Sequence, residues 1–160
     1  MSVTFRFFIV IVLIAADQIS KYWVEQSLTF QRSESFVPFI SFYRTYNEGI
    51  AFSGLSFIGN EFLIAMIFVI IGFVLWLWSQ LEKKRTISHF GFAFIIAGAL
   101  GNLIDRFYHG HVIDFIQFHT QNWSFAIFNL ADSMITIGAA LIILDEILQV
   151  LQAKQEIGDE

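Results

Sequence analysis

The chain has 160 residues, of which 56% are hydrophobic and only 14% are charged, and its formal net charge is −5 at pH 7. Soluble domains have roughly a quarter charged residues, so this composition predicts a single integral membrane domain over residues 1–160. An acidic chain without a basic stripe argues against binding to nucleic acid. Cysteine is absent, which excludes disulfides, thiolate metal sites and cysteine nucleophiles.

Four apolar runs are long enough to cross a bilayer as helices, since a span needs about 20 residues. We place them at about residues 7–24, 57–78, 87–104 and 125–150. Asp17 and Lys21 interrupt the first run at helical spacing, which puts both charges on one face where they can pair. A signal peptide is the alternative for this run because Arg6 precedes it, but no small-x-small cleavage site follows. The expected fold is therefore a mainly α, four-helix membrane bundle.

The segment between the first two runs has a different composition. Aromatic and β-branched residues dominate residues 36–46, which predicts one or two strands outside the bilayer core. Pro38, the only proline, restricts such a strand to a sheet edge or to an entry position. Residues 53–60 are rich in small side chains and flanked by turn signals, so they permit a mobile lid.

The third run contains small residues that favour close contact between helices. These residues are Gly91, Ala93, Ala97, Gly98, Ala99 and Gly101. A polar connection with three histidines is predicted over residues 105–123. We place Asn129 and Asp132 in the first turns of the fourth helix and predict a charged, frayed tail after residue 150.

The basic residues predict the orientation of the bundle. Lys83, Lys84 and Arg85 lie between the second and third runs, and the positive-inside rule places this loop in the cytoplasm. Four spans then put both termini in the cytoplasm too. Polar residues from distant segments fall on the outer face, namely Asn47, Asp105, Asp114, Asn129 and Asp132. Because charged groups at hydrocarbon are costly and usually functional, this convergence predicts a site there.

Asp114 and Asp132 are the candidate catalytic pair. Asp114 is flanked by apolar residues in VIDF, and Asp132 begins an apolar helix in NLADS. Two carboxyl groups that approach closely share one proton near neutral pH. One of them can then take a proton from water while the other donates a proton to a carbonyl oxygen. The alternative is that Asp132 caps its helix and Asp114 pairs with Arg106.

The other polar residues at this face suit supporting roles. Asp105 and Arg106 either form an interfacial ion pair or contribute to the site, where Arg106 would hold a substrate carbonyl or the carboxyl pair. Asn47, Asn102 and Asn129 need hydrogen-bond partners near the membrane, which suits support of the site or of a substrate backbone. Asn102 can equally mark the end of a helix.

Metal and serine chemistry have weaker signals. His109 and His111 are two positions apart, His119 stands alone, and no H-E-x-x-H motif occurs. We therefore interpret the three histidines as polar loop surface and expect no metal. No G-x-S-x-G motif is present to indicate a serine nucleophile.

Together these residues resemble the lipoprotein signal peptidase family, also called signal peptidase II. The resemblance covers essentially the whole chain and rests on five blocks in order. They are Asp17-Gln18 with Lys21, Asn47-Glu48-Gly49-Ile50-Ala51-Phe52-Ser53, Gly98-Ala99-Leu100-Gly101-Asn102 with Asp105-Arg106, Val112-Ile113-Asp114-Phe115, and Phe128-Asn129-Leu130-Ala131-Asp132-Ser133. Family members often have Gly where this chain has Ala97, and Pro in the segment where it has Phe125-Ala126-Ile127. Neither departure touches a catalytic position.

The resemblance implies an enzyme of the bacterial inner membrane that cleaves the signal peptide from prolipoproteins, just before a cysteine that carries a diacylglyceryl group. It implies catalysis by Asp114 and Asp132, with the site near the outer face, and an extracytoplasmic β-rich cradle at about residues 26–56. Supporting and substrate-contact roles are implied for Asp17, Lys21, Asn47, Gly49, Asn102, Asp105, Arg106, Asn129 and Ala131. No metal or cofactor is implied. We expect a monomer whose partners are lipid-modified prolipoproteins and membrane lipids.

Two other classes of function compete with this interpretation. A small proton-coupled transporter would also use carboxylates within a membrane domain, but relay carboxylates tend to sit mid-span, whereas these cluster at one face. A structural scaffold would need no paired aspartates and would not explain why the polar groups converge.

Overall fold

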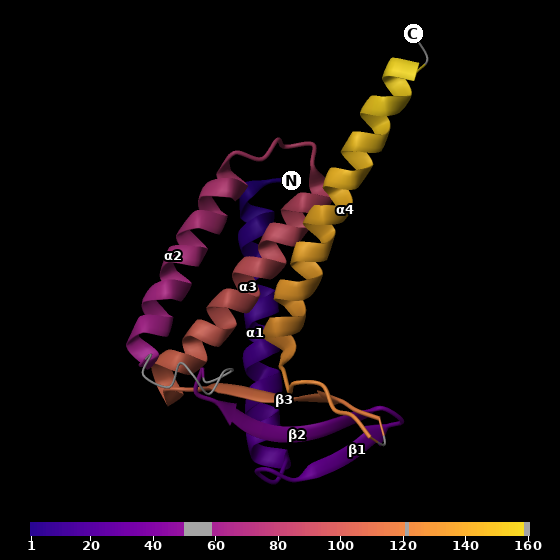
Figure 1. Ribbon diagram of the computed structural model, residues 1–160. Helices are drawn as coiled ribbons and strands as arrows, with labels where there is room; N and C mark the ends of the chain where they lie inside the picture. The colour runs from indigo at the N-terminus through magenta and orange to yellow at the C-terminus, as the bar shows by residue number, and fades with distance from the viewer. Residues whose placement is uncertain (50–58, 121, 159–160) are drawn as a thin grey trace.

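The structure, a computed structural model, describes residues 1–49, 59–120 and 122–158. Most of the segment 53–60, which the sequence permits as a lid, lies outside the described residues. Within them, four long helices stand beside one another, and a small sheet lies across one end of the bundle (Figure 1). The helices are α1 (Val3–Ser27), α2 (Asn60–Ser79), α3 (Thr86–His109) and α4 (Leu130–Gly158). Each is long and apolar enough to cross a membrane, which confirms the predicted mainly α bundle.

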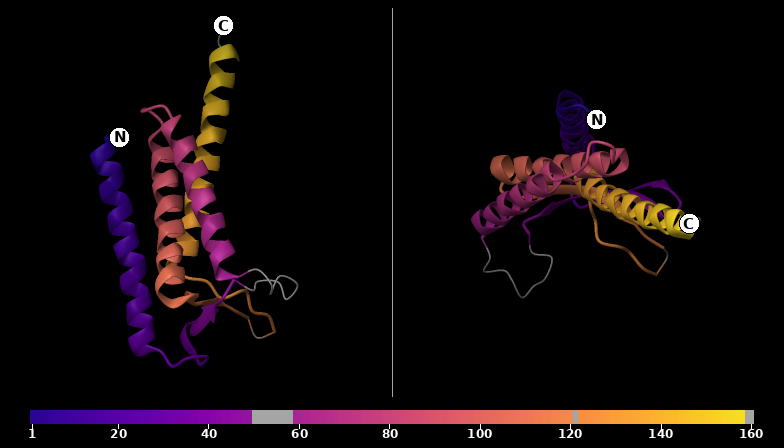
Figure 2. Two further views of the ribbon diagram at one scale, coloured as in Figure 1. Left: turned by 90° about the vertical axis from the view of Figure 1, so that its left-hand side faces the viewer. Right: turned by 90° about the horizontal axis from the view of Figure 1, so that it is seen from above.

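The helix α3 is the centre of the bundle, with α1, α2 and α4 each packed against it (Figure 2). Many of its side chains are buried, whereas α1 and α2 expose large apolar side chains over most of their surface. Helices that are apolar on nearly all sides are typical of membrane spans. The exposed apolar surface therefore faces lipid.

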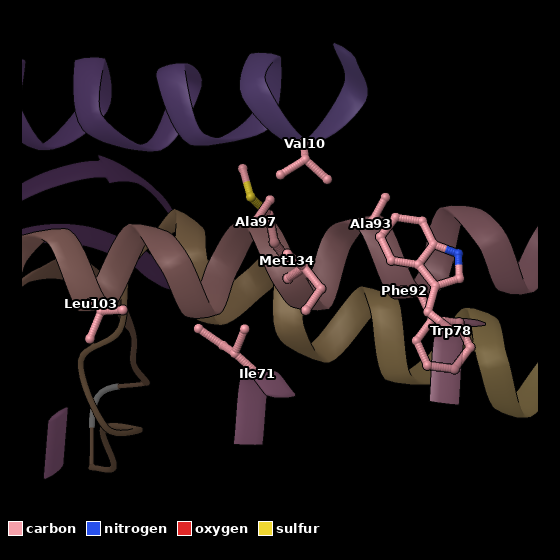
Figure 3. Packing of buried hydrophobic residues seen from close by; sticks show 9 residues of the cluster. Val10, Ile71, Trp78, Phe92, Ala93, Ala97, Leu103 and Met134 are labelled. Carbon is pink, nitrogen blue, oxygen red and sulfur yellow. The ribbon is translucent and has the colours of Figure 1, made fainter. Parts of the chain in front are cut away.

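The apolar core lies along α3 and is built on its alanines. Figure 3 shows Val10 of α1 directed toward Ala93 and Ala97, both fully buried on α3. Trp78 of α2 stacks on Phe92 of α3, with 6.1 Å between the ring centroids. Small side chains on the central helix let two neighbouring helices approach from different sides.

Glycines bring α3 and α4 into backbone contact. A Cβ atom added to Gly91 would lie 2.7 Å from the carbonyl oxygen of Gly138, and one added to Gly98 would overlap the carbonyl oxygen of Ala131. Because Ala131 adjoins Asp132, this contact also fixes the start of α4 against α3. The predicted role of the small residues in helix contact is confirmed at these positions.

Replacing Gly98 with valine is therefore expected to destabilise the bundle by about 1–3 kcal/mol, the usual cost of overpacking. Thermal unfolding of the detergent-solubilised protein measures the loss. The matched control is Gly72→Val in the middle of α2, where an added Cβ atom would meet nothing within 4 Å. Equal melting temperatures for the two variants would contradict the proposed close contact.

A three-stranded antiparallel sheet lies across one end of the helix bundle. Its strands are β1 (Ser33–Val37), β2 (Ile40–Asn47) and β3 (Val112–Phe118), in the order β1-β2-β3. Pro38 and Phe39 form the turn between β1 and β2, where Phe39 has a φ of 73°. One or two strands were predicted within residues 36–46; the structure has two strands there, the first of which begins earlier, at Ser33, and Pro38 lies between them.

The strand β3 was not predicted, because the segment 105–123 reads as a polar connection. In the structure β3 pairs with β2 and places Asp114 opposite Thr45. The extended chain that follows also bonds to β3: the backbone nitrogen of Phe125 donates to the Phe118 carbonyl at 2.7 Å. For this reason α4 begins at Leu130 rather than at residue 125. It also continues to Gly158, where a frayed tail was expected after residue 150.

The described ends of the chain lie away from the sheet (Figure 1). The connection between α2 and α3, which carries the three consecutive basic residues, lies at this same end. The sequence prediction that both termini and the basic loop share one end therefore agrees with the arrangement of the helices. The sheet and the polar residues of the candidate site occupy the opposite end.

Candidate active site

The sheet end of the bundle brings the two candidate aspartates together. Asp114 lies in the middle of β3 with 2% of its surface exposed, and Asp132 lies in the first turn of α4. Asp114 comes to this position because β3 turns back under the end of α3 after Gly110. Gly110 has a φ of 77°, a left-handed conformation that glycine adopts at the ends of helices.

The fully buried Asn129 joins the two aspartates. Its Nδ2 atom donates to Asp114 Oδ1 at 2.7 Å, and its backbone nitrogen donates to Asp132 Oδ2 at 3.2 Å. Asn102 approaches from α3 and donates from Nδ2 to Asp132 Oδ1 at 2.8 Å. Asn129 Nδ2 also donates to Asn102 Oδ1 at 3.1 Å. Asn129 thus donates to both carboxyl groups, to Asp114 from its side chain and to Asp132 from its backbone.

Asp132 also caps α4. The Oδ1 atom of Asn129 accepts from the backbone nitrogen of Asp132 at 2.9 Å, while Asp132 Oδ2 accepts from the backbone nitrogen of Asn129. This reciprocal pair has the form of a capping box. Helix capping, which the sequence suggested as an alternative to a catalytic role for Asp132, is therefore observed. It does not compete with the pairing, because Asp132 Oδ1 is free of the cap and bonds to Asn102.

Asp114 is held from the side of the sheet by Asn47, whose Nδ2 atom donates to Asp114 Oδ2 at 3.0 Å. The backbone nitrogen of Gly49 donates to Asn47 Oδ1 at 2.9 Å and so orients the amide. Gly49 has a φ of 88°, and an added Cβ atom would overlap Leu63. Burial, together with the neighbouring charge of Asp132, raises the pKa of Asp114 to about 6.

Three charged residues form a buried cluster beside the aspartates. Lys21 Nζ lies 2.8 Å from Asp17 Oδ2 and 2.8 Å from Asp105 Oδ2, and all three side chains are at most 2% exposed. Lys21 also donates to Asn102 Oδ1 at 3.1 Å. The predicted pairing of Asp17 with Lys21 on α1 is confirmed, and Asp105 of α3 completes the cluster.

The charged cluster fixes backbone segments around the two aspartates. Asp17 Oδ1 accepts from the backbone nitrogen of Ala131 at 3.0 Å, and Asp105 Oδ2 accepts from the backbone nitrogen of Ile113 at 3.2 Å. These acceptors hold the residues that directly precede Asp132 and Asp114. Gln18 adds donors to Asp17 at 3.1 Å and to Asp105 at 3.0 Å. Sequence reasoning gave Gln18 no role, although it directly follows Asp17.

Arg106 forms neither of the ion pairs that the sequence suggested. Asp105 pairs with Lys21, and no carboxylate in the described part of the chain forms an ion pair with Arg106. Adjacent residues on a helix point about 100° apart, so Asp105 faces α1 while Arg106 faces α2. There its backbone oxygen accepts from Asn60 Nδ2 at 3.2 Å. Its Nη1 atom is buried with no hydrogen-bond partner in the described residues.

A cavity of about 380 Å³ opens beside Asp114. It is lined by the end of β2 and by the chain that precedes α4, with residues Thr45, Tyr46, Asn47, Glu48, Asp114, Ala126 and Ile127. The end of β2, from Thr45 to Asn47, forms one wall. Thr45 and Tyr46 were not singled out from the sequence, and only the strand pattern of residues 36–46 signals their position.

Two of the three histidines differ from the expected polar surface, whereas His109, at the end of α3, is exposed as expected. His111 packs against Tyr46 with 4.0 Å between the ring centroids and the rings tilted by 33°, and burial lowers the pKa of His111. His119, the residue after β3, has its Nε2 atom 2.6 Å from Ser41 Oγ of β2. Both side chains therefore pack on the sheet. In the part of the chain that the structure describes, no three His, Asp or Glu side chains are grouped so that they could hold a metal ion.

The family model described as signal peptidase (SPase) II matches residues 9–148 of this chain. A lipoprotein signal peptidase of Sinorhizobium fredii is 55% identical over 140 residues, which cover 88% of this chain and 84% of the relative. One from Brucella ovis is 49% identical over 141 residues, which cover 88% of each chain.

Two solved structures of bacterial membrane enzymes, both determined by the in meso method, have the same fold. The first has a TM-score of 0.80 and 28% sequence identity, with 92% of this chain and 90% of that chain covered. The second has a TM-score of 0.78 and 29% identity, with 89% of this chain and 92% of that chain covered.

Proposed function

Because this chain belongs to the signal peptidase II family, whose members are membrane-bound aspartic-type peptidases, we propose that it cleaves the signal peptide from diacylglyceryl-modified prolipoproteins. The cut falls just before the lipidated cysteine. Asp114 and Asp132 are the catalytic residues, and no metal or cofactor takes part. The other polar residues of the site position this pair or contact the substrate.

The observation that carries this proposal is that one buried residue, Asn129, bonds both carboxyl groups: its side-chain amide donates to Asp114 and its backbone nitrogen donates to Asp132. The two carboxyl groups have different surroundings. Burial and the neighbouring charge favour the protonated form of Asp114, since its pKa is raised to about 6. Asp132 accepts from Asn102 Nδ2 and from the backbone nitrogen of Asn129, and it is half-buried, whereas Asp114 is buried.

These surroundings assign a role to each carboxyl group. Asp132 takes a proton from water as the water oxygen bonds to the scissile carbonyl carbon, and Asp114 donates its proton to the carbonyl oxygen. The tetrahedral intermediate then loses its amine: the C–N bond breaks, Asp132 gives its proton to the leaving nitrogen, and Asp114 recovers one from the intermediate's hydroxyl group. Both carboxyl groups return to their starting state.

Arg106 is the proposed contact for a substrate carbonyl group. Its buried Nη1 atom can donate a hydrogen bond and has no partner among the described residues. Gly49 lies close to this atom, since a Cβ atom added to Gly49 would be 3.5 Å from Nη1. A substrate backbone along the edge of the cavity would therefore meet both Arg106 and Asp114. A buried donor left without a partner is costly, so the substrate would supply the missing acceptor.

The chain is a bacterial membrane protein, and we place the sheet and the aspartates at the outer face of the inner membrane. The supporting observation is that the basic residues 83–85 lie at the opposite end, together with the described termini, which the positive-inside rule assigns to the cytoplasm. The signal peptide and the acyl chains of the substrate then approach from lipid. A monomer contains every residue of the proposed site.

The direct test is a gel-shift assay of the purified protein with a lipid-modified precursor. The proposal expects a shortened product that begins at the lipidated cysteine, and it expects the same precursor without the diacylglyceryl group to stay uncut. A proton flux across liposomes without any cleavage would favour the transporter instead. Cleavage at another bond would contradict the proposed position of the cut.

The raised pKa of Asp114 predicts how the reaction depends on pH. Below about 6 Asp114 holds a proton that it can donate, and above about 6 it loses that proton and with it the role of general acid. We therefore expect kcat/KM to fall as the pH rises through about 6, and initial rates at low substrate between pH 5 and 8 measure this. The Asn47 amide favours the charged form of Asp114, so Asn47→Leu should move the fall to higher pH. A profile that rises over this range would contradict the assignment of the acid.

A further inference from the structure

A second cavity lies far from the aspartates, in the half of the bundle near the termini. It is a groove of about 530 Å³ between α1 and α2, where Phe7 and Ile11 of α1 face Leu75 and Trp78 of α2. Ile96 and Leu100 of α3 form its floor. Its lining is almost entirely apolar. The groove exists because α1 and α2 each pack on α3 rather than on one another.

The length of the groove matches one leaflet of a bilayer. On α1 its lining extends from Val3 to Ile14, which is about 16 Å at 1.5 Å per residue. The hydrocarbon core of a bilayer is about 30 Å thick, so a transmembrane helix would need about twice this length. A single acyl chain of the leaflet at the termini end spans about half of the hydrocarbon core, which is close to the length of the groove.

Arg6 lies at the end of the groove and has a donor without a partner. Its guanidinium carbon lies 5.7 Å from the ring centroid of Trp78, and its Nη2 atom donates to the Met1 carbonyl at 3.2 Å and lies 3.0 Å from His89 Nε2. These contacts fix the guanidinium group. Its Nε atom is buried and has no hydrogen-bond partner in the described residues.

The positive charges of Arg6 and Lys83, near this end of the groove, also lack a carboxylate partner among the described residues. No described carboxylate forms an ion pair with Arg6 or with Lys83. The Lys83 carbonyl oxygen lies 3.4 Å from the Met1 backbone nitrogen, so Lys83 belongs to a segment beside the start of α1. An apolar groove that has Arg6 in its lining, with Lys83 in the neighbouring segment, has the character of a phospholipid site, and basic residues at a membrane surface attract anionic headgroups.

We propose that this groove binds an anionic phospholipid of the leaflet at the termini end. One acyl chain lies between α1 and α2 on Ile96 and Leu100, and a phosphate oxygen accepts from Arg6 Nε. The lipid fills the space between two helices that do not pack on each other. This proposal is independent of the catalytic one, because no residue of the groove belongs to the aspartate site.

Native mass spectrometry of the intact, detergent-purified protein tests the proposal. It is titrated with phosphatidylglycerol and with phosphatidylcholine of the same acyl chains. We expect about fivefold stronger binding of phosphatidylglycerol, the effect of one basic residue on an anionic lipid. Arg6→Gln should remove most of this preference, because Lys83 is still present in the neighbouring segment. Ile11→Trp places an indole in the groove at a side chain that is 64% exposed, and it should reduce the binding of both lipids.

The matched control is Arg32→Gln, an exposed arginine just before β1 at the sheet end, which should bind both lipids as the wild type does. Melting temperatures show whether each variant is folded. If Arg6→Gln is not folded, Ile11→Trp still tests the proposal. Equal binding of the two lipids by the wild type would overturn the proposal. An unchanged preference for phosphatidylglycerol in folded Arg6→Gln would also overturn it, and so would unchanged lipid binding in Ile11→Trp. A dimer that Ile11→Trp dissociates would overturn it too, because the occupant of the groove would then be a second copy of the chain.

Discussion

Asp114→Asn and Asp132→Asn are each expected to lower the cleavage rate of a lipid-modified precursor by at least about 10²–10⁴-fold, the usual contribution of one general acid or base. An asparagine has nearly the shape of an aspartate but cannot carry the proton. The rate should fall in kcat, because the change removes proton transfer and leaves the apolar contacts to the substrate intact. Single-turnover cleavage of the precursor, followed by gel shift, measures the loss.

Both substitutions also cost some stability, and the experiment has to separate that effect. Asp114 accepts from Asn129 and Asn47, and Asp132 accepts from Asn102 and the backbone of Asn129. Each new amide therefore turns one of its own donors toward an existing donor, at a cost of about 1–3 kcal/mol.

Asp145→Asn is the matched control for this loss of stability. Asp145 is a buried carboxylate of α4 at the termini end, where it accepts from Ser88 and pairs with Arg85 at 2.7 Å. Its replacement should lower the melting temperature but leave kcat unchanged. If Asp114→Asn or Asp132→Asn cleaved at a rate similar to that of Asp145→Asn, neither aspartate would be catalytic.

The sequence predicted which residues gather at one end of the bundle but not how they are bonded. Spacing along a helix placed Asp17 beside Lys21, because that pair is local. The third member of the cluster, Asp105, comes from a distant helix, and the adjacent Arg106 looked like its natural partner. Only the packing of α1 on α3 brings Lys21 to Asp105 and leaves Arg106 facing α2.

The strand β3 shows a second limit of sequence reasoning. Val112, Ile113, Asp114 and Phe115 are all buried, so the strand lacks the alternation of apolar and polar residues that identifies a half-exposed strand. Its pairing with β2 depends on a segment far away in the chain. The start of α4 also depends on a distant segment. The residues just before Asn129 form hydrogen bonds with β3, so they are extended and the helix begins only after them.

Lys21→Met is expected to destabilise the protein by about 3–5 kcal/mol, because it removes the only cation of the described residues that pairs with Asp17 and Asp105 and leaves two buried carboxylates together. Thermal or denaturant unfolding in detergent measures this loss. The matched control is Lys84→Met. Lys84 also pairs with a carboxylate, but Lys84 and Glu82 are 75% and 66% exposed, so the loss should be at most about 1 kcal/mol.

The same buried cluster should couple stability to catalysis, since Asp17 and Asp105 accept from the backbone nitrogens of Ala131 and Ile113, the neighbours of the two catalytic aspartates. Adding Asp105→Asn to Lys21→Met removes one of the two uncompensated charges and should recover part of the stability. It should not restore the cleavage rate, because a neutral amide presents a weaker acceptor to Ile113. A double variant no more stable than Lys21→Met would show that repulsion between the carboxylates is not the cause of the loss.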